Sequence, residues 1–296
     1  MRALILLFLL AGNGLLAQDP AFVVHTPRNQ YLFPEEAPPA YVFRDEAPLR
    51  SAPSTSAAIV ARLSPGTALS LDSLVQDTLE VDGVLSYWYQ VSTGKLTGYL
   101  WGGSIAQFAF GSHGDPNVKF LAGLDHIAPP GDTTRIDYSY RITAVRHGDV
   151  LDRIVVRSFA WSFEQVTSNG DRGMMGLDDI ITLAVPCVGG CGCATGEVVV
   201  FWSGGQFHHV ADLMGSPDAE YSTNTMFLYP SDMEGVSDAI IRVVSDYEEP
   251  KEADMEEGTA PYLIRTVLRE RLWWNGTELE SLGMLDEKRF RVVVDY

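Results

Sequence analysis

The chain has 296 residues, of which 46% are hydrophobic and 20% charged, so it is long enough for two globular domains and too apolar for a disordered chain. Its 39 Asp and Glu residues outnumber its 21 Lys and Arg residues, which gives a formal net charge of −18 and an isoelectric point near 4.6. An acidic surface repels polyanions, so the composition argues against nucleic-acid binding and against electrostatic docking on anionic lipid.

The first 17 residues have the pattern of a secretory signal peptide. Arg2 supplies the positive charge, residues 3–10 form an unbroken apolar run, and Ala17 is the small residue before the expected cleavage site. The apolar stretch is short for a membrane span, and no Cys lies near the cleavage site to carry a lipid. We therefore expect an exported chain, periplasmic or extracellular, without a stable membrane anchor.

The next stretch, residues 18–39, predicts an extended linker. It has no apolar periodicity and is rich in proline, which favours an extended backbone. The prolines are Pro20, Pro27, Pro34, Pro38 and Pro39. We expect this segment to hold the folded part of the chain away from the processed end.

The region after the linker has the pattern of short strands joined by tight turns. Residues 49–53 (LRSAP) open it and lead through a short strand to a turn at residues 65–67 (PGT). Residues 88–91 (WYQV) alternate large and polar side chains as a half-buried strand does, and residues 92–95 (STGK) have hairpin-turn chemistry. Residues 98–101 (GYLW) then return as a second strand.

This order of motifs resembles the bacterial SH3 (SH3b) domain over residues 40–111. The resemblance implies a small β-barrel that binds a peptide, either cell-wall peptide or an envelope protein partner. Wall-degrading enzymes carry such a domain as a targeting arm.

Aromatic side chains are more numerous in this region than the interior of a small barrel needs. They are Tyr41, Phe43, Tyr87, Trp88, Tyr89, Tyr99 and Trp101. We expect most of them to be core residues or cross-strand pairs, and one or two to line a shallow groove that binds a peptide or glycan by stacking. Tyr87 and Trp101 are the groove residues we favour, because both lie at strand ends beside turns.

The larger part of the chain, residues 115–296, predicts strands almost exclusively. Segments that begin at Gly148, Gly176 and Gly235 each have a glycine turn, an Asp within four residues and then a β-branched strand. They resemble the blades of β-propellers of the FG-GAP or VCBS type. Three units cannot close a ring of four to eight blades, so a partial propeller, an open stack and a β-sandwich all remain open. The predicted fold is therefore all-β, with a small SH3-like barrel followed by a larger β-rich domain.

Carboxylates in these repeats raise the question of calcium binding. They are Asp149, Asp152, Asp178, Asp179, Asp232 and Asp238. Calcium takes six to eight oxygen ligands, and each copy supplies one or two carboxylates. We interpret these residues as turn formers and expect no metal and no cofactor.

Three cysteines lie together at Cys187, Cys191 and Cys193, between strands predicted at residues 180–185 and 197–202. In an exported chain we expect a Cys187–Cys193 disulfide that closes an antiparallel hairpin and leaves Cys191 unpaired. The alternative is a thiolate metal site with His208 or His209 as a fourth ligand. Those two histidines are adjacent in a strand, so their side chains face opposite sides and cannot grip one ion together.

Motifs of known enzyme classes are absent from the sequence. It contains no phosphate-binding loop, no H-E-x-x-H, no G-x-S-x-G and no Cys-His hydrolase signature of the kind that accompanies SH3b domains. The prediction is a non-enzymatic binding protein of the cell envelope. The rival hypothesis is a divergent envelope hydrolase with its active site in residues 115–296, where Asp125, His126 and His147 are the candidates.

Overall fold

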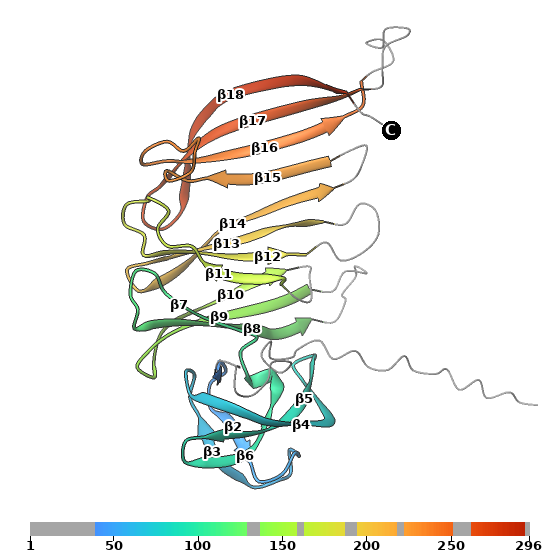
Figure 1. The fold of residues 1–296 in the computed structure, drawn as a ribbon, viewed down its shortest axis with the longest axis vertical. Coiled ribbons are helices and arrows are strands. Elements are labelled where there is room, and N and C mark those ends of the chain that lie inside the picture. The colour runs from blue at the N-terminus through green and yellow to red at the C-terminus, as the bar shows by residue number, and fades with distance from the viewer. Residues whose placement is uncertain are drawn as a thin grey trace, which may run out of the picture.

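A computed structural model describes residues 39–128, 137–158, 163–186, 194–217, 222–250 and 262–293. Within these ranges the chain forms strands β1 to β18 and a single turn of 3₁₀ helix, η2 (Gly102–Ser104). The strands belong to three sheets, with a small barrel at one end of the molecule and β18 at the other (Figure 1). No helix in these ranges is long and apolar enough to cross a membrane. The predicted all-β class is confirmed.

The barrel is a six-stranded sheet with the order β1-β4-β5-β6-β2-β3. Its strands are β1 (Ala40–Tyr41), β2 (Ala47–Arg50), β3 (Ile59–Leu63), β4 (Ala68–Val81), β5 (Val84–Thr93) and β6 (Leu96–Trp101). Alternation along β5 sends Tyr89 and Val91 into the barrel, where they pack against Leu49 and Leu100. A bridge between Val42 and Ile105 joins the two ends of this unit.

The second unit is a β-sandwich of two antiparallel layers. One layer has the order β10-β9-β8-β7 and contains β7 (Phe108–Gly111), β8 (Val118–Ala128), β9 (Asp137–Arg146) and β10 (Asp149–Ser158). The other contains β11 (Gln165–Ser168), β12 (Asp179–Val185), β13 (Thr195–Ser203) and β14 (Gln206–Pro217). Phe120 of the first layer meets Trp202 of the second edge-on, with ring centroids 5.5 Å apart. Strand β7 pairs with β8 and therefore belongs to the sandwich, so the barrel ends before it, near Ile105.

Four more strands continue the second layer. They are β15 (Ser222–Leu228), β16 (Ile240–Glu248), β17 (Tyr262–Trp274) and β18 (Leu279–Val293). Among the described residues β14 and β15 pair through two residue pairs alone, Ser216 with Thr223 and Pro217 with Ser222. A second apolar cluster lies next to this junction, and within it Phe201 and Trp274 have ring centroids 5.0 Å apart. Strands β15–β18 therefore extend the same eight-stranded sheet, and one of their faces packs in the second apolar cluster.

The predicted repeats mark loops of this meander and not propeller blades. Gly148 lies in the β9–β10 turn, while Gly176 and Gly235 lie in the loops before β12 and β16. Those two loops meet: the Ser231 amide donates to the Arg172 carbonyl at 3.1 Å, and the Arg172 side chain pairs with Asp232. Of the architectures left open by the sequence, the described strands form the sandwich.

The hairpin predicted around the cysteines is confirmed in its strands. β12 and β13 pair antiparallel, from Ile180 opposite Phe201 to Val185 opposite Gly196. Cys187, Cys191 and Cys193 lie outside the described residues, so the disulfide stays a prediction.

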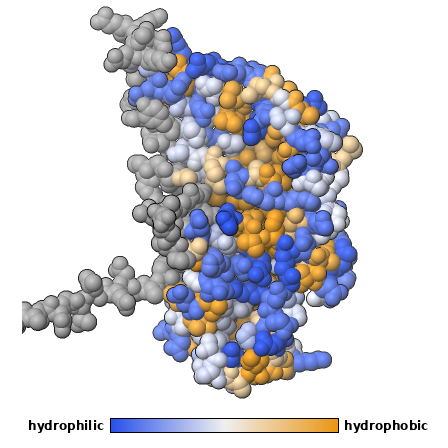
Figure 2. Space-filling model, turned by 180° about the vertical axis from the view of Figure 1, so that it is seen from behind, coloured by the Kyte–Doolittle hydropathy of each residue, from blue (hydrophilic) through white to orange (hydrophobic). Residues whose placement is uncertain are grey.

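The surface of this acidic chain is not uniformly hydrophilic. Figure 2 shows apolar residues gathered in patches between hydrophilic regions on the face opposite to that of Figure 1. Several large apolar side chains of β18 are exposed, among them Leu282, Met284, Leu285 and Phe290.

Candidate functional site

The outer face of the barrel is covered by the sandwich. Trp88 of β5 and Trp101 of β6 are cross-strand partners, and their exposed fractions are 3% and 6%. Together with Val84 they belong to the same apolar cluster as sandwich residues such as Phe120. The Trp101 indole Nε1 donates a hydrogen bond to the Leu79 carbonyl at 2.9 Å, which satisfies its polar group in this contact.

The two predicted groove residues lie on different sides of the barrel sheet. Tyr87 follows the alternation of Tyr89 and packs, partly buried, against the barrel core. Trp101 belongs to the opposite face and is buried in the contact with the sandwich. The structure does not bring the two rings together, and of the pair only Tyr87 keeps partial access to solvent.

Arg44 is a polar link between barrel and sandwich that the sequence analysis did not single out. Its guanidinium donates to the carbonyls of Leu124 and Asp125 and lies 3.8 Å from the Asp125 carboxylate. It also lies over the Trp101 ring, with 5.2 Å between Cζ and the ring centroid. Burial lowers the pKa of Arg44, and the Asp125 carboxylate opposes that shift. Nothing in the local sequence indicates this role, because its polar partners lie between 38 and 81 positions away.

The β4–β5 turn is a second link. Asp82 and Gly83 have φ values of 54° and 77°, and the Ile127 amide donates to the Asp82 carbonyl at 3.0 Å. A Cβ atom on Gly83 would lie 2.5 Å from the Ile127 carbonyl oxygen. Glycine is therefore required at this position both by its backbone angle and by the close approach of β8.

The residues of the hydrolase hypothesis do not converge. Asp125 is engaged by Arg44 and by Arg141, whose Nη2 lies 3.1 Å from its carboxylate. His126 pairs with Ser139 at one end of β9, and His147 follows the other end of that strand in an exposed turn. Eight residues of strand separate the two histidines by roughly 25 Å. They cannot act on one substrate bond.

A Ser–His–Asp cluster lies elsewhere, around the fully buried Asp179. The hydroxyls of Ser112 and Ser168 and the backbone amide of His113 all donate to its carboxylate. The Ser168 hydroxyl proton is thus directed to Asp179, so the His113 Nδ1 atom at 2.9 Å donates to Ser168 and does not act as its base. The cluster is a clamp between the β7–β8 loop and strands β11 and β12.

Other carboxylates interpreted as turn formers hold backbone amides in the same way. Asp152 accepts from the Phe207 amide at 2.8 Å, and Asp232 accepts from the Tyr229 amide at 2.7 Å. Among the residues that the structure describes, no group of three or more His, Cys, Asp or Glu side chains is arranged to hold a metal ion.

The adjacent histidines of β14 have separate partners, as their alternation predicts. The His208 ring packs edge-on against Trp274, with 5.2 Å between centroids. His209 Nε2 lies 2.9 Å from the Asp212 carboxylate. The two imidazoles therefore face different surroundings and do not form a joint site.

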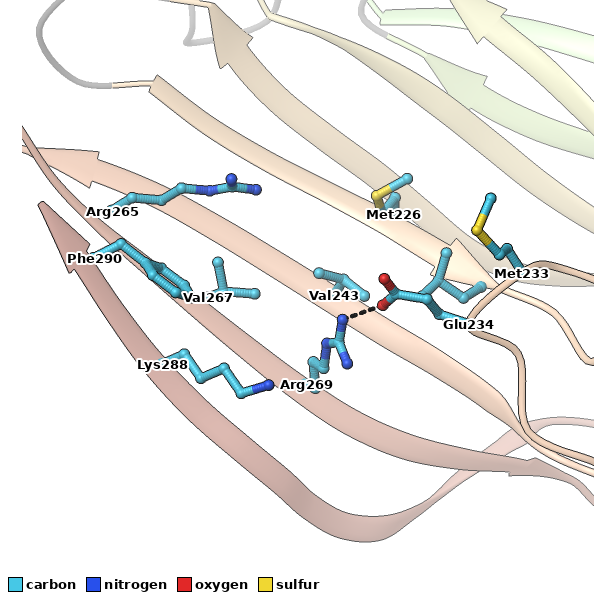
Figure 3. A pocket seen from close by; sticks show the side chains of 10 residues that line it. Met226, Met233, Glu234, Val243, Arg265, Val267, Arg269, Lys288 and Phe290 are labelled. Carbon is cyan, nitrogen blue, oxygen red and sulfur yellow. Dashed lines mark hydrogen bonds and ion pairs between the residues drawn. The ribbon is translucent and has the colours of Figure 1, made fainter. Parts of the chain in front are cut away.

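A shallow pocket of about 460 Å³ lies at the other end of the molecule, on the face of β15–β18 away from the second apolar cluster (Figure 3). Sequence reasoning missed it, because its side chains come from four strands and one loop. The residues that line it are Met226, Leu228, Met233, Glu234, Val243, Arg265, Val267, Arg269, Lys288 and Phe290. We call this surface the C-terminal groove.

Comparison with known families identifies the barrel. Residues 45–106 match the bacterial SH3 domain family, and the match begins in the barrel and ends before β7. They form a bacterial SH3 domain. Domains of this family bind cell-wall peptidoglycan or peptides. No curated protein and no solved structure matches the chain.

Proposed function

We propose that the chain is an exported binding protein of the bacterial envelope, and that its SH3 domain binds cell-wall peptide or an envelope protein partner without catalysing a reaction. The observation that carries this proposal is the family match over residues 45–106. Export rests on the signal-peptide pattern of the first 17 residues.

The binding surface we propose lies around Tyr87. The sandwich covers Trp88 and Trp101, so an aromatic contact with a ligand has to come from a ring that is still accessible. Tyr87 is partly buried against the barrel core, which fixes its ring and lowers the conformational entropy lost when a peptide or glycan stacks on it.

Sedimentation with purified peptidoglycan tests the wall-binding form of this proposal. The full chain is expected to sediment with the wall polymer, and Tyr87→Leu is expected to reduce that fraction, because leucine keeps apolar bulk but removes the stacking ring. Full retention of Tyr87→Leu would reject Tyr87 as the contact. A folded wild-type chain that stays in the supernatant would reject wall binding and leave an envelope protein as the partner.

Tyr99→Leu is the matched control. Tyr99 is also partly buried, but it packs against the cluster shared with the sandwich and lies on the face away from Tyr87. We expect this variant to sediment as the wild type does. Loss of retention in Tyr99→Leu alone would move the contact to the opposite face of the SH3 domain.

Thiol titration tests the export part. In an oxidising compartment the denatured, unreduced chain should give one free thiol, with Cys187 and Cys193 joined and Cys191 free. Reduction should lower stability by about 2–3 kcal/mol or less, because the closed loop is small. Three free thiols in protein isolated from the envelope would contradict the disulfide, and tightly bound zinc with them would favour the thiolate metal site.

A further inference from the structure

The C-terminal groove has an apolar floor on a sheet face that nothing covers in the described structure. Val243 and Val267 form the floor and are 8% exposed, while Met226 and Phe290 at its sides are 45% and 47% exposed. The floor residues lie on adjacent strands and face the same side, since Val243 pairs with Arg269 and Val267 with Lys288. Exposed apolar area of this kind on a protein surface marks a contact surface.

Basic side chains stand beside this floor. Arg265 and Arg269 lie four residues apart on β17, and Lys288 lies next to them on β18, where its Nζ is 3.4 Å from the Asp286 carboxylate (Figure 3). Strand β17 carries Arg265, Arg269 and Arg271 with a single acidic residue, Glu270. In a chain where acidic residues outnumber basic ones 39 to 21, this strand has the opposite balance.

Two arginines of the groove differ in their partners. Arg269 is paired with the carboxylate of Glu234, which reaches it from the loop before β16. Arg265 donates from Nε to the buried Ser245 hydroxyl at 3.0 Å and lies over the Tyr247 ring, 5.5 Å from its centroid. These contacts hold the guanidinium in place, and no carboxylate among the described residues pairs with its two terminal nitrogens. A guanidinium held in this way is suited to a bidentate carboxylate.

We propose that the C-terminal groove binds an extended acidic segment of a partner protein, with a carboxylate on Arg265 and apolar side chains on Val267 and Phe290. Charge complementarity selects the acidic partner, and a groove lined by side chains of four neighbouring strands can accommodate an extended segment. An extended peptide points every second side chain to the same side, so the segment has to carry acidic and apolar residues in turn at every second position, with the residues between them facing solvent. This site is separate from the SH3 domain and does not depend on its ligand.

Fluorescence anisotropy with a labelled peptide of repeating Glu-Ser-Leu-Ser units, which points Glu and Leu to the same side, tests the proposal when the peptide is added to the full chain at physiological ionic strength. Binding is expected for this peptide and not for versions with Lys in place of Glu or Ser in place of Leu. Arg265→Glu should weaken binding about tenfold or more, since it removes a charge-assisted hydrogen bond and adds repulsion. Arg265→Gln should weaken binding less than Arg265→Glu. This variant replaces Arg265→Glu in the test if the charge-reversal variant does not fold.

Arg289→Glu is the matched control. Arg289 is adjacent to Phe290 on β18, pairs with Thr266 and Glu248, and faces the opposite side of the sheet from the groove. It carries the same charge change, so unaltered binding in this variant supports the groove. Equal loss in both variants would show attraction by general charge and overturn the proposal. Binding of dodecanoate without binding of the Glu/Leu peptide would overturn it too, in favour of a lipid site.

Discussion

The outer face of the SH3 domain and the outer face of β15–β18 are both faces of antiparallel sheets, but in the part of the chain that the structure describes only the first is covered by another sheet of the same chain. Both faces carry aromatic and aliphatic side chains, yet Trp101 is 6% exposed and Phe290 is 47% exposed. The first face meets the sandwich, while among the described residues the second is lined at one side by the loop before β16 and meets no second sheet. Apolar alternation therefore identifies a face that can pack, but the rest of the fold decides whether it is covered by the same chain.

Polar contacts separate the two faces further. Around Trp101 the Leu79 carbonyl and the Arg44 guanidinium complete the contact from the barrel side, and Arg44 reaches the β8 carbonyls as well. In the C-terminal groove Arg265 has terminal nitrogens without such a partner among the described residues. Arg44 is thus engaged within the chain through its terminal nitrogens, although its buried Nε has no hydrogen-bond partner among the described residues, whereas the terminal nitrogens of Arg265 are available to a carboxylate from outside.

The largest effect is expected at Trp101. Replacing it with Ala leaves a cavity between the barrel and the sandwich and leaves the Leu79 carbonyl without its donor. We expect a loss of about 3–5 kcal/mol in the free energy of unfolding. Urea unfolding followed by tryptophan fluorescence and by circular dichroism measures it. A loss below about 1 kcal/mol would mean that this face packs no more tightly than an exposed one.

A smaller effect is expected at the β4–β5 turn. Gly83→Ala places a Cβ atom against the Ile127 carbonyl at a positive φ, so we expect a loss of roughly 2–3 kcal/mol. Gly94→Ala is the control, because Gly94 also has a positive φ but no atom within 4 Å of the added Cβ. It should cost about 1 kcal/mol. Equal losses would show that the close approach of β8 adds nothing to the free-energy cost of the positive φ.

The smallest effect is expected at Phe290. Its side chain is about half exposed, so Phe290→Ala should change the free energy of unfolding by less than about 1 kcal/mol. The same variant should still weaken binding of the Glu/Leu peptide. A large loss of stability would place Phe290 in the folded core and would remove the contrast with Trp101.

The sequence alone determined the local features of this protein. The ordered motifs from residue 49 to residue 101 identify the SH3 domain, because strand alternation and turn chemistry depend on neighbours in the chain. The same reasoning predicted the β12–β13 hairpin, whose strands flank a short connection. It also predicted separate environments for His208 and His209, since adjacent residues of a strand face opposite sides.

Only the tertiary structure decided which surfaces are covered. Trp101 and Tyr87 are equally plausible groove residues in the sequence, and they differ because the sandwich covers Trp101 and leaves Tyr87 partly accessible. The Asp179 clamp joins residues more than sixty positions apart, and the C-terminal groove draws on four strands. Such contacts are set by how sheets pack, which depends on the shape and twist of whole layers. A pattern of neighbouring residues does not encode that information.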